Sequence, residues 1–431
     1  MQFENEKYDY VISGTSLYKS ILSAALSRAG QKVLHVDPNS YYGSEYEASF
    51  DLKSFSEDAN NNNAEQVVKG PLYEKYTSEK SLNRKFVLDL CPRLLYANGS
   101  MVKLLVKSKI CRYLEFRNVS GFYIEDGSDN KLLSVPCSKS ALFTTNSLNP
   151  LEKRKMMKFI QENSAEEAEN GEKSVPDENV IFGDYLKTLD LTPRLEKYIS
   201  SCLAFSNKND TLKTVKHRID LFLSSYGKYG QSAFLFPLYG NAELHQAFCR
   251  LSAVFGATFC LNYESPDKLK NSCQAKEFIF EDSSSLHKSK KLFKAVVVTN
   301  KSLFESTLNQ ENNSQGDNVD LLILDNNVTC FQISGKGGNI APTDSFVYYF
   351  SGNKMEDLKS RVDKLLNDQN DEIKNSHICS IFLKENVECV FDYESEVLAA
   401  KEKFHQLLGE DVEFLEAAPE PEDIIRGEGE N

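Results

Sequence analysis

The chain has 431 residues, of which 41% are hydrophobic and 11% aromatic, with no tryptophan. At roughly 100 to 200 residues per domain this length predicts about two domains, and the apolar content excludes a collagen, a coiled coil and a chain disordered throughout. The formal net charge of −13 is unevenly distributed, because residues 409–431 carry −8 and residues 161–179 carry −6, which leaves +1 for the rest. A near-neutral body has no basic face for nucleic acid, so we expect no nucleic-acid partner.

The sequence shows neither a targeting signal nor a metal-binding motif. The first seven residues include acids and no apolar run, and no stretch approaches the ~18 apolar residues of a membrane helix. The ten cysteines form no CxxC pair and the six histidines no HxxxH pair. We therefore expect a cytoplasmic protein with reduced thiols, no structural metal and no disulfide framework.

The first forty residues predict a strand, a helix and a second strand. Residues 8–13 are rich in β-formers, and residues 32–36 read as a second buried strand. Between them an apolar stripe at helical spacing ends at Gly30, and Asp37 follows the second strand; the stripe is Leu17, Ile21, Leu22, Ala25 and Leu26. This order of elements is typical of the opening of a dinucleotide-binding domain.

The phosphate-binding turn of that domain is altered here. It needs glycine at three places, for the tight turn, for close approach to the pyrophosphate and for helix packing. This chain has Gly14, then Ser16 and Lys19 where the second and third glycines belong. A side chain at Ser16 would obstruct the pyrophosphate, so we expect that the fold is kept and the cofactor lost, with Asp37 and this turn as vestiges. A flavin-dependent oxidoreductase is the remote alternative.

The middle of the chain shows mainly helical patterns. A helix starts at Pro150, with Met156, Phe159 and Ile160 on its apolar face. The acidic residues 161–179 that follow predict a surface loop. Further helical patterns occupy residues 182–189, 194–205 and 214–225. We therefore expect a helical insert domain at residues 115–229.

The rest of the chain predicts one larger, discontinuous domain of residues 1–114 and 230–408. Strands are expected at residues 86–90, 234–236, 294–299, 321–324 and 345–350, and near Phe278. Helices are expected at residues 242–255 and 394–408, and from Leu94 to Leu105 with an interruption at Asn98 and Gly99. Polar loops are expected at residues 51–70 and 309–320, and residues 409–431 read as an acidic disordered tail.

Three blocks of the sequence resemble the family of Rab escort proteins and Rab GDP-dissociation inhibitors. They are residues 34–43, which include Tyr42, residues 89–99, and residues 234–256. The ending at residues 419–425 is more similar to the escort branch, whereas the short chain has the size of an inhibitor. We expect the escort branch, with an inhibitor that extracts and recycles prenylated Rab proteins as the alternative.

The resemblance implies a fold, partners and sites. The implied fold class is α/β, a flavin-oxidase-like dinucleotide-binding fold without cofactor and with an inserted smaller, mainly helical domain. The large domain would bind GDP-bound Rab GTPases, and no residue would be catalytic. The matching positions for this Rab-binding platform are Tyr42, Glu243, Arg250 and Cys260. The chain departs from the family pattern nearby, with Ala242 for a glycine and His245 for a proline.

The helical insert would dock the αβ heterodimer of Rab geranylgeranyltransferase through an aromatic anchor, for which Phe159 is the expected residue. Basic side chains on the same helix would face the transferase; they are Lys153, Arg154, Lys155 and Lys158. The insert would also hold the geranylgeranyl lipid of the client, with transient delivery to membranes. Each position also has a structural alternative: Tyr42 at a strand end, Glu243 and Arg250 on a solvated helix face, and Phe159 in the core of the insert.

Overall fold

The computed structural model describes most of the chain. It covers residues 6–44, 46–55, 73–77, 86–126, 131–163, 179–263, 269–270, 273–280, 291–304, 318–325, 328–367, 375–384, 387–388 and 391–415. Most of the polar loop expected at residues 51–70, most of the acidic loop expected at residues 161–179 and all of the ending at residues 419–425 lie outside the described residues.

The strand, helix and strand predicted at the start of the chain are confirmed as β1 (Lys7–Ser13), α1 (Leu17–Arg28) and β2 (Val33–Val36). β1 pairs in parallel with β2 and with β12 (Gln274–Ile279), and β11 (Thr258–Cys260) pairs in parallel with the other edge of β2. Gly30, at φ +78°, ends α1: its amide donates to Ser27 O and the next amide donates to Leu26 O. This is the Schellman arrangement, in which glycine adopts the left-handed conformation.

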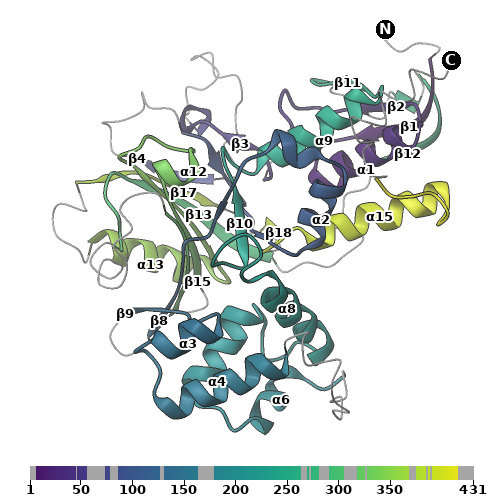
Figure 1. Ribbon diagram of the computed structural model, residues 1–431. Helices are drawn as coiled ribbons and strands as arrows, with labels where there is room; N and C mark the ends of the chain where they lie inside the picture. The colour runs from purple at the N-terminus through teal and green to yellow at the C-terminus, as the bar shows by residue number, and fades with distance from the viewer. Residues whose placement is uncertain are drawn as a thin grey trace.

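Helix α1 is buried along nearly its whole length between α9 (Ala242–Val254) and α15 (Glu394–Leu408) (Figure 1). Small side chains let α1 and α9 approach closely. Ser23 Oγ and Ser27 Oγ lie 2.7 and 3.0 Å from the Ser252 hydroxyl of α9, so each buried hydroxyl has a hydrogen-bond partner. The position of α9 is therefore set by the first helix of the chain.

The second large sheet has nine strands. Its order is β4-β17-β13-β16-β15-β14-β8-β9, with β18 (Val387–Glu388) also paired to β13. All its pairs are antiparallel except β14 with β8. Helix α13 (Met355–Asn367) covers one face with Leu358 and Val362. The strands are β4 (Tyr73–Thr77), β8 (Gly121–Asp126), β9 (Lys131–Ser134), β13 (Lys291–Thr299), β14 (Val319–Leu324), β15 (Val328–Ser334), β16 (Phe346–Gly352) and β17 (His377–Leu383).

Short elements join the two sheets. β10 (Phe234–Pro237) pairs with β6 (Leu95–Tyr96) and β7 (Phe116–Asn118), and β3 (Ser49–Phe50) pairs with β5 (Leu88–Asp89). The prediction of a helix from Leu94 was wrong at its start, because residue 95 is in β6 and α2 (Ser100–Lys107) begins after Gly99. The remaining elements are η1 (Leu52–Phe55), η3 (Ile110–Tyr113) and α12 (Gly335–Gly338).

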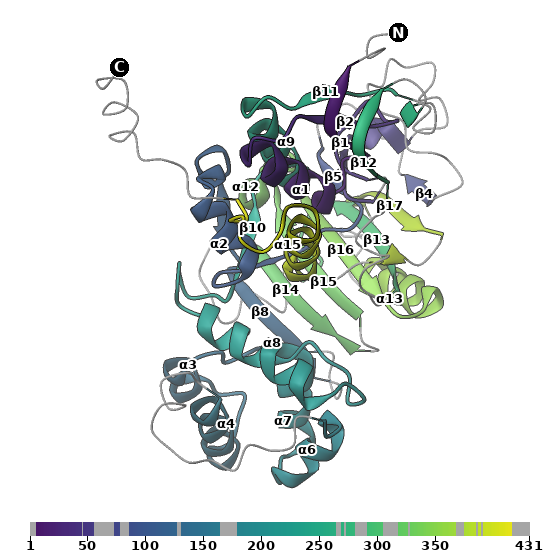
Figure 2. The ribbon, with the colours of Figure 1, turned by 90° about the vertical axis from the view of Figure 1, so that its right-hand side faces the viewer.

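Residues 139–163 and 179–225, called the helical segment below, lie beyond one end of the nine-stranded sheet in both ribbon views (Figures 1 and 2). Its elements are α3 (Lys139–Thr144), α4 (Pro150–Glu162), α6 (Phe182–Thr188), α7 (Pro193–Lys197), the π-helix η4 (Tyr198–Leu203) and α8 (Leu212–Ser225). An Asn149 and Glu152 capping box with Pro150 in the first turn starts α4.

The predicted insert at residues 115–229 contains more than helices. Strands β7, β8 and β9 fall within it and pair with strands outside it or with each other. One core cluster runs without a break from Met156 of α4 through Ile124 of β8 to Tyr349 of β16. The division into domains stays a prediction, and the helical part begins at Lys139.

The first residues of the expected tail at residues 409–431 are not free, and residues 416–431 lie outside the described part of the chain. Phe414 and Leu415 are buried against α2 and α15, and Lys107 of α2 donates to the Phe414 carbonyl oxygen at 3.2 Å. The acidic composition of residues 409–431 led to the prediction of a disordered tail, although these two apolar residues lie within it. Within the part of the chain described here, no helix is long and apolar enough to cross a bilayer.

We predict that Phe414→Ala lowers the free energy of unfolding by about 3 kcal/mol, because it leaves a cavity in a packed core. Leu398→Ala is the control, since this side chain of α15 is 49% exposed, and it should change stability by less than about 0.5 kcal/mol. Urea unfolding measures both. Equal effects of the two variants would mean that Phe414 is not packed as described.

Candidate functional site

The turn between β1 and α1 is occupied by the protein's own side chains. Gly14 has φ +92°. The backbone amide and the hydroxyl of Thr15 both donate to Asp37 Oδ2 at 2.6 Å. Burial raises the pKa of Asp37, although these hydrogen bonds and that from Asn39 act in the opposite direction. The carboxylate that contacts ribose in a dinucleotide-binding domain is thus engaged internally.

The two residues that replace glycines are buried. Ser16 precedes the first residue of α1, and the side chain of Lys19 is folded back over the turn. Lys19 Nζ donates to the Phe280 carbonyl oxygen at 3.2 Å and lies 3.0 Å from where a Cβ on Gly14 would be. The space above the turn is therefore filled by a lysine side chain.

The amino-terminal end of α1 holds a carboxylate of the chain itself. Glu47 Oε2 accepts the Leu17 amide at 3.2 Å, at the end of the helix where a dinucleotide would place its pyrophosphate. Arg93 bridges Glu47 and Glu396, at 2.9 Å to each, and His245 Nε2 lies 3.4 Å from Glu47. We call these four residues the Glu47 cluster. Glu47 occupies the place of the pyrophosphate, Lys19 fills the space above the turn, and Asp37 is hydrogen-bonded within the chain. The residues present therefore do not fit a flavin or nicotinamide dinucleotide.

The next feature is a hollow of about 330 Å³ on the outer face of α9. Its lining residues come from α9, from η3, from β11 and from the turn after β2; they are Tyr42, Tyr113, Glu243, Gln246, Ala247, Cys249, Arg250, Ala253 and Phe259. The structure thus brings together three of the four positions expected for the Rab-binding platform. Cys260 does not line the hollow, but it follows Phe259 in β11 and is half-buried.

The hollow suits recognition of another protein surface. Glu243 and Arg250 stand two helical turns apart on the same face of α9, and the ring of Tyr42 packs edge-on against Phe259 at 6.3 Å between centroids. Burial raises the pKa of Glu243. Burial also raises the pKa of the Cys249 thiol to about 12, so this thiol stays protonated and is a poor nucleophile. Opposite charges beside aromatic rings are typical of protein–protein contacts.

The two departures from the family pattern, Ala242 and His245, are both buried residues of α9. Tyr239 and Gly240 have φ +68° and +97°, which turn the chain into α9, and the next amide donates to the Asp89 carboxylate. His245 is 1% exposed and contacts Glu47 rather than the hollow. A histidine in place of proline therefore adds a contact below the platform and leaves Glu243 on its surface.

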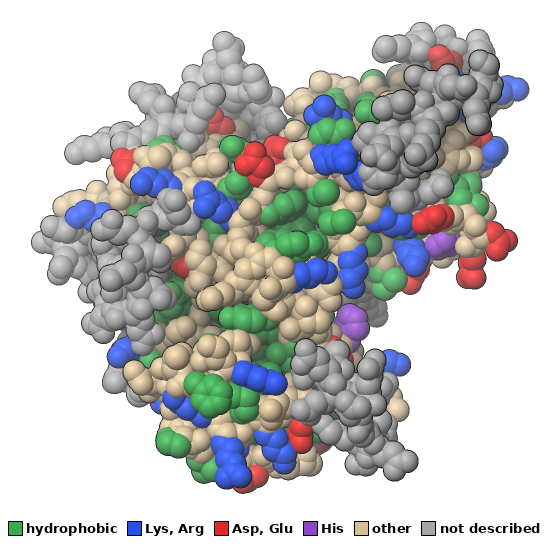
Figure 3. Space-filling model, viewed as in Figure 1, with side chains coloured by type: hydrophobic (Ala, Val, Ile, Leu, Met, Phe, Trp, Pro, Cys, Tyr) green, Lys and Arg blue, Asp and Glu red, His purple; other side chains and the backbone are tan. Residues whose placement is uncertain are grey.

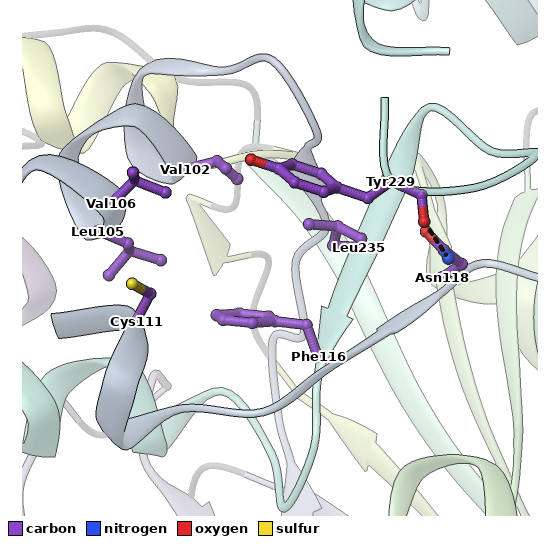
Figure 4. A pocket seen from close by; sticks show the side chains of 8 residues that line it. All are labelled: Val102, Leu105, Val106, Cys111, Phe116, Asn118, Tyr229 and Leu235. Carbon is purple, nitrogen blue, oxygen red and sulfur yellow. Dashed lines mark hydrogen bonds between the residues drawn. The ribbon is translucent and has the colours of Figure 1, made fainter. Parts of the chain in front are cut away.

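A second, apolar cavity of about 300 Å³ is lined by side chains of α2, η3, β7 and β10 and by Tyr229 (Figure 4). Sequence reasoning missed it, because its residues come from five separate stretches: Val102, Leu105, Val106, Cys111, Phe116, Asn118, Tyr229 and Leu235. The side-chain amide of Asn118 donates from Nδ2 to the Tyr229 carbonyl oxygen at 2.9 Å and closes one edge of the cavity. Such a cavity accepts apolar groups.

The residue expected as the transferase anchor is in the wrong environment. Phe159 is 4% exposed and packs with Met156 and Ile160 in the core, as the structural alternative required, so it cannot contact a partner without unpacking α4. Two other apolar side chains nearby are exposed: Phe143 of α3 at 76% and Leu151 of α4 at 60%. Figure 3 shows hydrophobic side chains flanked by lysine and arginine over this part of the helical segment.

The basic residues of α4 differ in their surroundings. Lys153 donates to the Phe143 carbonyl oxygen at 3.1 Å, Lys155 pairs with Asp190 at 2.9 Å, and Lys158 is 4.0 Å from Glu162. Arg154 is exposed and forms no ion pair within the described residues. Phe143 is exposed and Phe159 is buried, a difference that could not be predicted from the sequence.

The fold and the site together define a protein of the dinucleotide-binding class whose cofactor position is closed and whose surface carries a hollow lined by charged and aromatic side chains. Comparison with known proteins narrows this class. The family profile described as GDP dissociation inhibitor matches residues 4–299. The chain is 30% identical to Rab proteins geranylgeranyltransferase component A of Drosophila melanogaster, over 97% of this chain and 92% of that protein. The chain therefore belongs to the GDP dissociation inhibitor family.

Other similar proteins agree with the family and the fold. Component A 2 from Homo sapiens is 31% identical over 60% of this chain and 43% of the human protein. The crystal structure of Rab GDI from Plasmodium falciparum superposes with a TM-score of 0.68 at 20% identity, covering 95% of this chain and all of that chain. A putrescine oxidase superposes with a TM-score of 0.52 at 10% identity, covering 94% and 99% of the two chains. The α/β dinucleotide-binding fold is thus confirmed.

The Glu47 cluster gives a pH-dependent prediction. Burial alone would raise the pKa of Glu47, but hydrogen bonding and charge from His245, with Arg93 and the Leu17 amide, outweigh it and lower the pKa from 4.5 to about 2. A carboxyl whose pKa is lower in the folded state stabilises the fold above its unfolded pKa, and this contribution is lost as the pH falls through the folded value.

We therefore expect Glu47→Gln to cost on the order of 3 kcal/mol of unfolding free energy above pH 5, and progressively less between pH 4.5 and 2. Urea unfolding at several pH values measures the difference. Glu356→Gln, at an exposed carboxyl of α13, should leave stability unchanged throughout. A cost for Glu47→Gln that does not vary with pH would contradict the assignment of an ionised, partnered carboxylate.

Proposed function

We propose that this protein is a Rab escort protein, the accessory component A of Rab geranylgeranyltransferase. It binds newly made, GDP-bound Rab GTPases, presents their carboxyl-terminal cysteines to the αβ catalytic heterodimer, and then carries the prenylated product to membranes. The single observation that carries the proposal is the hollow on α9, in a chain that is similar over 97% of its length to a protein named component A.

The Rab-binding platform consists of Tyr42, Glu243 and Arg250, with Cys260 at its edge. Glu243 and Arg250 form charge-assisted hydrogen bonds to the GTPase, and Tyr42 is the amphipathic anchor between them and β11. Support comes from their common position around one hollow, on a helix fixed from below by Ser252 and the Glu47 cluster.

The chain itself makes and breaks no covalent bond. Its contribution is positional: a GTPase held on the platform keeps its flexible carboxyl-terminal segment at high effective concentration near the transferase. The geranylgeranyl lipid of the product is held by the helical segment until delivery, which keeps the client in solution in the cytoplasm apart from transient contact with membranes.

Phe143 replaces Phe159 as the proposed anchor for the transferase. A large aromatic side chain that is 76% exposed can bury most of its surface in a partner's pocket, which is typical of residues that dominate binding energy. Leu151 and Arg154 lie three apart on one face of α4 and extend this surface with an apolar group and an exposed charge.

The second candidate function is that of a Rab GDP-dissociation inhibitor, favoured by the description of the matching family profile. An inhibitor would bind prenylated Rab and extract it from membranes without supporting prenylation. The platform serves both functions, and the exposed Phe143 surface favours the escort function.

Lipid transfer to an unprenylated, GDP-loaded Rab by the purified αβ transferase separates the two functions. We expect addition of this protein to start prenylation, and Glu243→Ala to raise the concentration needed for half-maximal stimulation about tenfold, because a platform charge is lost. Glu356→Ala should behave as the unmodified protein. Extraction of prenylated Rab from vesicles without any stimulation of lipid transfer would instead establish the inhibitor function.

The transferase anchor has its own test. Phe143→Ala should reduce the affinity of the complex of this protein and Rab for the transferase about tenfold or more, while the affinity for Rab itself stays unchanged. Titration of fluorescently labelled Rab measures the two steps separately. Val180→Ala, at an exposed apolar residue before α6, is the matched control. Wild-type affinity of the Phe143→Ala complex for the transferase would exclude this surface.

A further inference from the structure

Tyr113 belongs to the hollow but to none of the expected site positions. It is the last residue of η3, and its side chain is 50% exposed. The guanidinium carbon of Arg250 lies 4.4 Å from the centroid of the Tyr113 ring. At this distance the positive charge is attracted by the face of the ring, a cation–π contact.

This contact decides where Arg250 points. Arg250 is exposed, and none of the ion pairs found in the described residues includes it. A long arginine side chain without a carboxylate partner samples many rotamers, and each one lost on binding weakens the complex. The ring of Tyr113 removes part of this freedom before a partner arrives.

The turn that carries Tyr113 is well fixed. Lys109 has φ +61° and reverses the chain after α2, and the Arg112 amide donates back to the Lys109 carbonyl oxygen at 3.2 Å. Ile110 is fully buried, so η3 is anchored in the core. The ring is therefore presented by a rigid element rather than by a loose loop.

We propose that Tyr113 is a positioning residue and a member of the Rab-binding platform: it stacks the guanidinium of Arg250 and orients it toward a carboxylate on the GTPase. A guanidinium whose face rests on a ring keeps its N–H edge free for paired hydrogen bonds to a carboxylate. The partner chemistry at this point is an acidic side chain beside apolar surface. This inference rests on the proposed function.

A double-mutant cycle on Rab affinity tests the inference. The variants are Tyr113→Ala, Arg250→Ala and the double variant, with GDP-loaded, unprenylated Rab as the probe. Each single change should weaken binding about three- to tenfold, and the double variant should be little weaker than Arg250→Ala alone, because the ring acts through the guanidinium. Thermal unfolding of the free proteins should stay nearly the same, since both side chains are exposed.

Two further variants separate positioning from bulk contact. Tyr113→Phe keeps the ring face and should retain nearly full affinity, whereas Tyr113→Leu keeps apolar bulk and should be as weak as Tyr113→Ala. Lys32→Ala removes another exposed cation above a ring, that of Tyr8, at the opposite end of β2, and should leave Rab affinity unchanged.

The outcomes distinguish this inference from the function on which it rests. If Arg250→Ala leaves Rab affinity unchanged, the platform is wrongly placed, and both proposals fail. If Arg250→Ala weakens binding but the effect of Tyr113→Ala adds to it in full, the platform stands and the positioning role of Tyr113 is overturned. Strong non-additivity together with an unaffected Tyr113→Phe variant supports the inference.

Discussion

The contact between the Glu47 carboxylate and the amino-terminal end of α1 is the constraint on which the rest of the site depends. Helix amino termini attract anions, and this fold normally supplies the phosphates of a cofactor there. Here the anion is part of the chain, and Arg93 and His245 extend it to α15 and α9. One buried charge cluster thus joins α1, α9 and α15 at this point, and α9 presents the hollow on its far side.

The sequence was sufficient where the signal is local. The strand, helix and strand at the start follow from alternation, an apolar stripe and Gly30, and the identities of Ser16 and Lys19 alone indicate a filled phosphate turn. That Glu47 supplies the anion could not be predicted, because it lies 30 residues from Leu17 and only the fold brings the two together. The expected platform positions converge on one hollow, although their contact with a GTPase stays a proposal.

Several errors of prediction share one physical origin, because the exposure of a side chain depends on which face of its element packs against the rest of the fold. Phe143 of α3 and Phe159 of α4 are equally aromatic, and only the way each helix packs leaves the first on the surface and buries the second in the core. The residues of the apolar cavity are likewise ordinary core residues in sequence, and neighbours only in space. The acidic composition of residues 409–431 predicted a free tail from residue 409. The apolar side chains of Phe414 and Leu415 are nevertheless buried in the core.

The serine contacts between α1 and α9 bear on how inherited or engineered variants should be interpreted. Ser252 has no exposed surface and lies on the face of α9 opposite the hollow. A larger side chain there would push α9 away from α1 and tilt the recognition face, although no group on that face would have changed. Loss of binding in a variant therefore does not locate the binding surface, and substitutions at buried hydroxyls beneath a recognition helix can be mistaken for lesions in the interface itself.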